Sequence, residues 1–176
     1  MIISKFKNHL FFNSLITKKS SDQLLLELYK MQSTKNKKII LHVNSNGGDV
    51  YSALNIVDNL ESFRLLGTEI ITVGEGLVAS AATLLLVSGS KRLIRPNARF
   101  LMHQIRCLNG ISGTYTNIKD ELYNIDSLNN SMIEIYKKNS KMTYNMIQTN
   151  ILNEKELTAI ECINNGLVDW YYSDTK

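Results

Sequence analysis

Ser80 is the residue whose type and setting best fit nucleophilic catalysis. It follows the apolar, strand-like run EIITVG (69–74) and a predicted glycine-containing turn, and it begins a predicted helix that ends at Val87. A serine between a strand and a helix exposes its hydroxyl beside the positive end of the helix dipole. The alternative is a tightly packed structural helix, which the small residues on either side would also suit: Ala79, Ala81 and Ala82.

A nucleophilic serine needs a base, and the sequence holds three histidines. His9 lies near the N-terminus with no motif around it. His42 lies inside the predicted strand IILHVN (39–44), where it alternates with apolar residues and should line one face of a sheet. His103 ends the extended run ARFLMH (98–103), where a strand delivers its side chain to a loop. His103 is therefore the candidate base, and a buried structural histidine is the alternative.

Two glycine-containing segments follow predicted strands. In the loop NSNGGD (44–49), adjacent glycines let the backbone approach a ligand closely and present its N–H groups, although a simple turn needs them too. Residues 74–79 have the GxGxxA spacing of a dinucleotide-binding turn. Such a turn requires an acidic residue about 20 positions later, and residues 76–119 contain no Asp or Glu. The spacing therefore fails as a nucleotide motif.

The elements that must position these residues alternate between strands and helices. A Ser20–Gln23 capping box predicts a helix over 21–32, and apolar spacing predicts further helices. Strand and helix segments in units of about 30 residues indicate an α/β fold with a mainly parallel sheet. The predicted elements are strands at 39–44, 69–74 and 167–172, extended segments on both sides of Pro96, and helices through 53–63, 80–87 and 118–139, with a last helix ending at Asn165 before Gly166.

Composition bounds the class of protein. The 176 residues, 44% hydrophobic and 20% charged, predict one globular domain over 1–176, and no run of 18 apolar residues predicts a membrane span. Cys107 and Cys162 lie in no metal-ligand spacing, so we expect no metal site and a reducing compartment. Nucleic-acid binding is disfavoured because net charge is only +4 and the basic stretch 91–106 has no aromatic platform beyond Phe100.

Three separated motifs together resemble the proteolytic subunits of the Clp ATP-dependent proteases. They are VNSNGGDV (43–50), VGEGLVASAATLLLVSGSKRLIRPNARFLMHQ (73–104) and LTAIECINNGLVD (157–169). The resemblance implies a serine peptidase in which Ser80 is the nucleophile and His103 the general base. It places the backbone N–H groups of Gly48 and Ala81 in the oxyanion hole, and the third triad member at Glu154, with Asn153 as the alternative orienting group.

The same resemblance implies an architecture and partners. It predicts a ClpP/crotonase-like spiral of repeated β-β-α units, a protruding handle helix over 118–139, and a short N-terminal arm over about 1–10. It implies stacked heptameric rings of one or two kinds of subunit, polypeptide substrates, and an AAA+ unfoldase that alone would use ATP. We expect no cofactor in the chain itself, and a cytoplasmic or organelle-matrix location. The sequence departs from the family pattern at Asn46 for proline, Glu154 for Asp, Ile105 for proline, and a two-residue shortening at Lys91–Arg92.

Two other functions stay open. The chain is a non-catalytic ring subunit if it assembles with active paralogues and hydrolyses nothing alone. A crotonase-like enzyme would use a similar pair of backbone N–H groups to stabilise an enolate and would bind acyl-CoA. The coincidence of Ser80 and His103 with the family's catalytic positions favours the peptidase.

Overall fold

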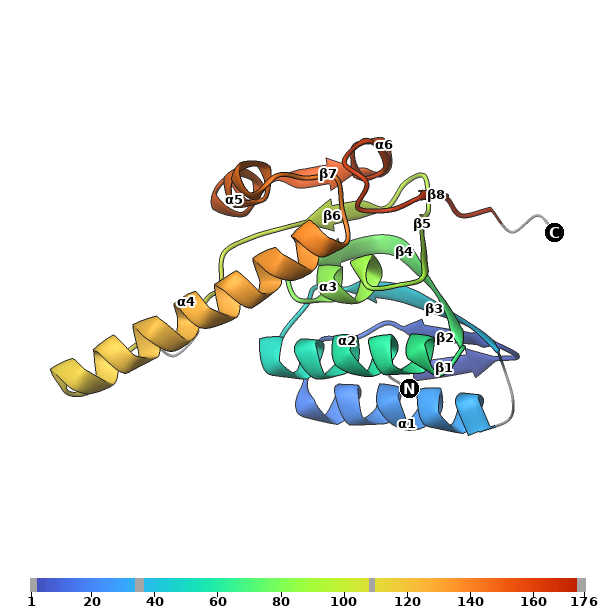
Figure 1. Cartoon of the computed structure of the whole chain (residues 1–176), viewed down its shortest axis with the longest axis horizontal. Coiled ribbons are helices and arrows are strands. Elements are labelled where there is room, and N and C mark those ends of the chain that lie inside the picture. Colours follow the sequence, from blue (N-terminus) through green and yellow to red (C-terminus); the bar gives the residue numbers. More distant parts are fainter. Residues whose placement is uncertain (1–2, 34–36, 108–109, 174–176) are drawn as a thin grey trace.

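The computed structural model describes residues 3–33, 37–107 and 110–173, which form one eight-stranded sheet with six helices (Figure 1). The strands run in the order β1-β2-β3-β4-β5-β8, while β6 pairs with β4 and β7 pairs with β6. All pairings are parallel except β1 with β2 and β6 with β7. The predicted α/β class and mainly parallel sheet are confirmed. The strands are β1 Ile3–Phe6, β2 His9–Phe12, β3 Lys38–Ser45, β4 Glu69–Ala79, β5 Lys91–Ile94, β6 Arg99–Leu101, β7 Glu156–Thr158 and β8 Trp170–Tyr171.

The helices cover one face of the sheet and one of its edges. α1 and α2 lie side by side against the sheet, and the core fills the space between them and the alternating apolar residues of β2, β3 and β4 (Figure 1). No helix in the described ranges is long and apolar enough to span a bilayer. The helices are α1 Lys18–Ser33, α2 Val50–Leu65, α3 Ala82–Val87, α4 Tyr115–Lys138, α5 Tyr144–Leu152 and α6 Ala159–Asn164.

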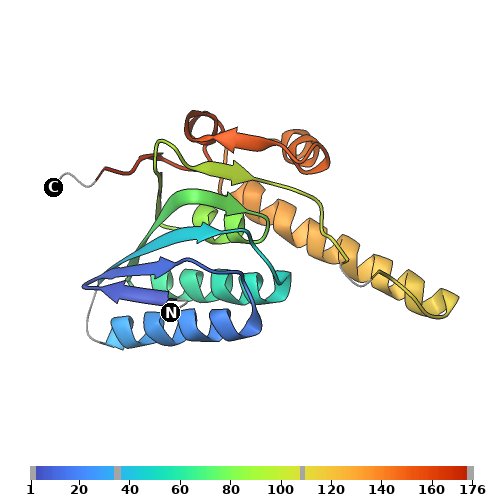
Figure 2. The same cartoon turned by 180° about the vertical axis from the view of Figure 1, so that it is seen from behind.

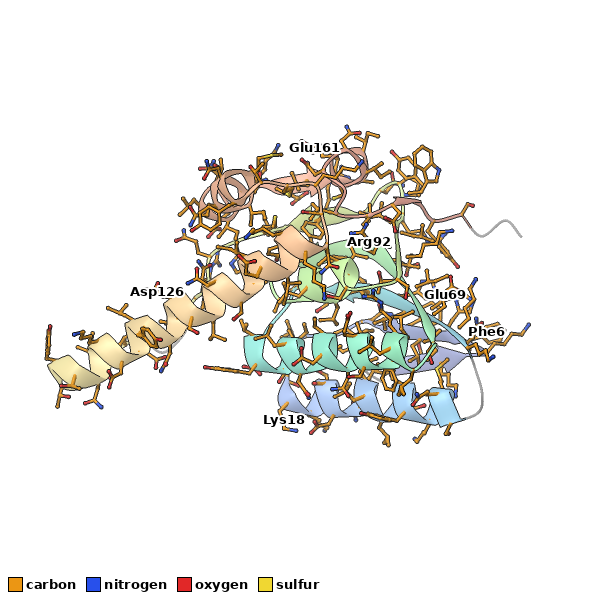
Figure 3. All side chains as sticks on the ribbon, viewed as in Figure 1. Phe6, Lys18, Glu69, Arg92, Asp126 and Glu161 are labelled. Atoms are coloured by element: carbon orange, nitrogen blue, oxygen red, sulfur yellow. The ribbon has the colours of Figure 1, made fainter. Side chains whose placement is uncertain are left out.

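The long helix α4 begins three residues before the predicted start. Its C-terminal part packs on the core through Met132, Ile133 and Tyr136. The part before Asp126 extends away from the rest of the chain (Figure 3). Its apolar side chains remain exposed there, among them Leu122 at 52%. The apolar stripe predicted from the sequence is therefore buried by the described chain only at its C-terminal end.

Several local predictions were wrong for identifiable reasons. The helix predicted from 21 begins at Lys18, because Thr17 and Ser20 each accept a hydrogen bond from the other's backbone N–H, at 3.1 and 2.9 Å. Residues 3–10 of the predicted arm, together with Phe11 and Phe12, form the β1–β2 hairpin, which pairs with β3; residues 1–2 lie outside the described residues. Helix α5 and strand β7 were not predicted. Gly166 after the last helix, with φ of 67°, is confirmed.

The predicted turn over 74–79 is instead the second half of strand β4. A register shift between Val43 and Ser45 lets β4 continue as far as Ala79. At this bulge Gly76 has φ of 55°, and a Cβ there would lie 2.8 Å from Asn44 Oδ1. The glycines therefore mark a bulge with close side-chain approach, which is a common meaning of glycine inside a strand.

His42 lies on the predicted sheet face and is almost fully buried, with 2% of its surface exposed. Its Nδ1 lies 2.9 Å from Glu75 Oε1, and its Nε2 lies 2.8 Å from His9 Nδ1. Phe11 stacks on the ring at 4.3 Å, and Arg95 contacts Glu75 at 3.1 Å. Burial lowers the pKa of His42, and the nearby carboxylate of Glu75 opposes this only partly. This cluster joins the N-terminal hairpin to the centre of the sheet.

We predict that this histidine makes folding stability depend on pH. Because the pKa of His42 is lower in the folded than in the unfolded chain, the unfolded chain binds the extra proton first as pH falls. Stability should therefore decline as pH drops below about 6.5 and level off below the folded-state pKa. Urea unfolding followed by circular dichroism at pH 7.5 and 5.5 tests this. The decline should be smaller in His42→Phe; equal declines in both proteins would contradict it.

Candidate active site

The parallel strands of the sheet bring the predicted site residues to one edge. β3, β4 and β6 are parallel neighbours, so their carboxyl ends meet at one edge (Figure 2). The loop 46–48 follows β3, Ser80 follows β4, and His103 lies two residues beyond β6. This edge is where ligands gather in open α/β sheets. Strand β7 runs antiparallel to β6, so the residues before it arrive at the same edge.

Ser80 sits in a strained backbone conformation immediately after β4. Its φ is 56°, the left-handed region that non-glycine residues rarely occupy. Its N–H donates to the carbonyl of Leu101 at 2.9 Å, which holds the turn against the end of β6. A serine on a strained turn between a strand and a helix is the arrangement of a nucleophile elbow. The helix itself begins at Ala82, two residues later than predicted, with Ala81 as N-cap.

The glycine loop packs directly on this turn. Gly47 has φ of 88°, and a Cβ there would lie 2.5 Å from Ser80 Cβ and 2.7 Å from the carbonyl oxygen of Ala79. Ile16 anchors the loop from the other side: its N–H donates to Gly47 at 2.8 Å, and its carbonyl accepts from Asp49 at 2.9 Å. Gly47 thus contacts the candidate nucleophile. This contact was not predicted from the sequence.

The backbone N–H groups of Gly48 and Ala81 bond to no acceptor within the described ranges; Gly48 is exposed and follows the Gly47 that contacts Ser80. Ala81 is fully buried. A buried backbone N–H without a partner is rare in folded proteins, because leaving it unpaired costs free energy. These are the two groups predicted for the oxyanion hole, and both are available to donate a hydrogen bond to a ligand oxygen.

Helix α4 supports the Ser80 turn through a buried hydrogen-bond chain. The Thr83 hydroxyl donates to the carbonyl of Ser80 and lies 2.6 Å from the hydroxyl of Tyr136. Burial raises the pKa of Tyr136 to about 12, so this hydroxyl stays protonated. The sequence offered no signal for this chain, because Thr83 and Tyr136 are 53 residues apart.

His103 lies at the predicted place, partly exposed beyond the end of β6. Its Nδ1 lies 2.7 Å from the carbonyl oxygen of Gln104, an acceptor that requires Nδ1 to carry the proton. This tautomer leaves Nε2 unprotonated, which is the state a general base needs. Among the hydrogen bonds of the described residues none joins His103 to Ser80, so the two residues share an edge without being bonded.

Glu154 follows the C-cap of α5 and also has a left-handed backbone, with φ of 47°. Glycine is the usual residue at such a position, so a glutamate there is strained. Its Oε2 accepts from Arg106 Nη2 at 2.7 Å. In the described part of the chain, no hydrogen bond or ion pair joins Glu154, or the alternative Asn153, to His103. The assignment of the third triad member stays a prediction.

Other chemistry finds little support at this edge. Across the described residues, no group of three or more His, Cys, Asp or Glu side chains could hold a metal ion. Cys162 is buried, which raises the pKa of its thiol to about 12 and makes it a poor nucleophile. Cys107 is exposed and unpaired by any disulfide. The roles of Ser80 and His103 as the reactive side chains stay predictions.

A comparison with protein-family models decides the family. The model described as Clp protease matches residues 2–173, nearly the whole chain. The chain belongs to the Clp protease family. The predicted resemblance is confirmed, and the α/β sheet described above agrees with it.

Curated relatives carry the same description at low identity. The chain is 30% identical over 164 residues to the "ATP-dependent Clp protease proteolytic subunit" of Bigelowiella natans, covering 92% of this chain and 82% of that protein. It is 28% identical to proteolytic subunit 1 of Leifsonia xyli, over 91% of this chain and 80% of the relative. With proteolytic subunit 2 of Tropheryma whipplei it shares 33%, over 74% and 71%. The chain is thus similar to proteolytic subunits of Clp proteases along most of their length.

We predict that Gly47→Ala disables the site through its contact with Ser80. The added Cβ would collide with the Ser80 Cβ as well as straining the backbone. Gly67→Ala is a matched control, since Gly67 has a similar φ of 84° and no atom within 4 Å of the added Cβ. Both variants should lose about 1 kcal/mol of stability from backbone strain, and Gly47→Ala should lose more because of the collision. Only Gly47→Ala should lose peptide hydrolysis, by at least about 10²-fold, as an oxyanion-loop displacement would. Equal activity in both variants would contradict the prediction.

Proposed function

We propose that this chain is a serine endopeptidase of the Clp type that hydrolyses peptide bonds in unfolded polypeptides. The observation that carries the proposal is the strained Ser80 turn, which is followed by the buried Ala81 N–H without an acceptor and shares an edge with the Gly48 loop and His103. Backbone strain in folded proteins concentrates at functional sites, where the surrounding contacts maintain it. A structural serine would need neither the strain nor the unpaired donors.

In the proposed mechanism Ser80 Oγ attacks the scissile carbonyl, and its proton passes to His103 Nε2. Gln104 holds the imidazole through Nδ1–H. The N–H groups of Gly48 and Ala81 stabilise the oxyanion, each contributing on the order of 10²- to 10³-fold in rate. His103 then returns the proton to the leaving amine, and water hydrolyses the acyl-enzyme by the same route. Every step uses side chains or backbone of this chain and needs no metal or cofactor.

A cavity beside His103 supports a preference for apolar substrate side chains. It has a volume of about 190 Å³ and lies between α4, α5 and the segment that follows His103. Gln104, the residue bonded to the base, lines it. Three further lining residues are polar, namely Asp126, Asn129 and Gln148, and the other five are aliphatic: Ile105, Ile125, Ile133, Ile151 and Leu152. We infer that an aliphatic or aromatic residue next to the scissile bond occupies this cavity.

The exposed apolar residues of α4 support assembly. Large apolar side chains on an extended helix favour burial against a partner chain. We propose that α4 is the handle helix that joins two rings, that the rings are heptameric, and that an AAA+ unfoldase supplies substrate. The residues concerned are Tyr115, Ile118, Leu122 and Tyr123, from 36% to 80% exposed.

One observation favours a second function, a ring subunit that is inactive alone. The Ser80 and His103 side chains are not bonded to each other, and Glu154 is bonded to Arg106. A chain whose triad side chains are not bonded to one another would have only a structural role in a mixed ring with active paralogues. Co-expression that yields mixed rings, together with no hydrolysis by rings of this chain alone, would favour that function.

We predict that Ser80→Ala and His103→Ala each lower peptide hydrolysis by at least about 10³-fold, because each removes a group that acts in the same step. The measurement is turnover of a fluorogenic peptide with an apolar residue at the cleaved bond, on rings of verified size. Ser62→Ala, an exposed serine of α2, is the control and should match the wild type. Retained turnover in Ser80→Ala rings would overturn the proposal.

A further inference from the structure

The inference begins with the position of Glu154 relative to His103. In the β6–β7 pair, Arg99 lies opposite Thr158, Phe100 opposite Leu157 and Leu101 opposite Glu156. The ladder ends at this last pair, and His103 and Glu154 each lie two residues beyond it along the chain. The backbone therefore brings His103 and Glu154 to the same end of the β6–β7 pair.

The Glu154 side chain nevertheless bonds elsewhere. Its Oε2 accepts from Arg106 at 2.7 Å, while His103 Nδ1 uses the carbonyl of Gln104. Both members of the ion pair are largely exposed, Arg106 at 59% and Glu154 at 42%. Arg106 lies only three residues beyond His103, so its guanidinium shares the surroundings of the base. Arg106 and a protonated His103 would therefore compete for the Glu154 carboxylate.

We propose that Arg106 is a positioning residue that restrains the activity of this chain by holding Glu154 away from His103. This inference rests on the proposed peptidase function. When Ser80 attacks, its proton passes to Nε2 and the imidazole becomes a cation, which a nearby carboxylate stabilises. The Arg106 cation neutralises that carboxylate and disfavours a second positive charge beside it. Because exposed ion pairs are weak, the restraint lowers the rate moderately and does not abolish it.

The test is the second-order rate constant for labelling of Ser80 by a fluorophosphonate probe, measured on assembled wild type and variants. Arg106→Gln should raise the rate constant about two- to fivefold, the range that an exposed ion pair accounts for. Arg106→Lys keeps the charge and should give no comparable gain. In the Glu154→Gln background, Arg106→Gln should give no gain, because the carboxylate that it releases is absent.

A matched control and a salt titration separate this restraint from a structural effect. Arg99→Gln breaks the ion pair between Arg99 of β6 and Glu156 of β7, which is 3.3 Å long and similarly exposed. It should leave the labelling rate unchanged. Raising ionic strength should accelerate labelling of the wild type more than of Arg106→Gln, since salt screens exposed pairs.

The outcomes are distinguishable. An unchanged or lower rate in Arg106→Gln, with Ser80 still labelled, overturns the role of Arg106 and leaves the proposed peptidase standing. A gain that persists in the Glu154→Gln background also overturns it, since Arg106 would then act through another group. No labelling at Ser80 in any assembled variant overturns the peptidase itself, and this inference with it.

Discussion

The parallel pairing of β3, β4 and β6 is the constraint on which the candidate site depends. The register sets Ser45 beside Val78 and Ala79 beside Leu101, so three chain segments leave the sheet at one edge. The hydrogen bond from the Ser80 N–H to the Leu101 carbonyl then fixes the turn that carries the proposed nucleophile. Nothing in the loops alone would bring these segments together; the ladder hydrogen bonds of the buried strands do so.

The same constraint explains why the site's residue types are so restricted. Gly47 contacts Ser80 so closely that no side chain fits, and the left-handed turn at Ser80 leaves the Ala81 N–H without a protein acceptor. Both features cost stability, through strain and through an unpaired donor. The apolar core beneath α1 and α2, together with the Thr83–Tyr136 hydrogen bond, keeps this arrangement in place. The strain is consistent with a site that selection has retained for chemistry.

The sequence predicted the parts of this site that depend on local pattern. Strand-like runs ending at residues 44 and 103 located the loop and His103, and the pattern around Ser80 located a junction between a strand and a helix; the role of Ser80 as nucleophile stays a prediction. Residues 74–79 were mistaken for a turn because a bulge in a strand uses the same glycines as a turn. Contacts that depend on packing between distant segments left no local signal: Gly47 on Ser80, Tyr136 on Thr83, and the Arg106–Glu154 pair.

The predicted acidic member of the triad is the residue for which the sequence and the structure differ. The family resemblance points to position 154, whereas the side chain there is bonded to Arg106. A glutamate with φ of 47° at a helix end is strained where glycine or asparagine would be favoured. A carboxylate retained in spite of that strain is consistent with a role that is exercised when His103 gains its proton.

The central claim is that the fold of this chain activates Ser80 as a nucleophile. Its most direct test is tandem mass spectrometry of the assembled chain after reaction with a fluorophosphonate, to locate and count the adducts. The account predicts one adduct for each chain, on Ser80, and none when the chain is unfolded in urea before the reaction, because the activating groups come from separate strands. Adducts spread over other serines, an adduct on Ser80 that survives unfolding, or no adduct on the assembled chain would contradict it.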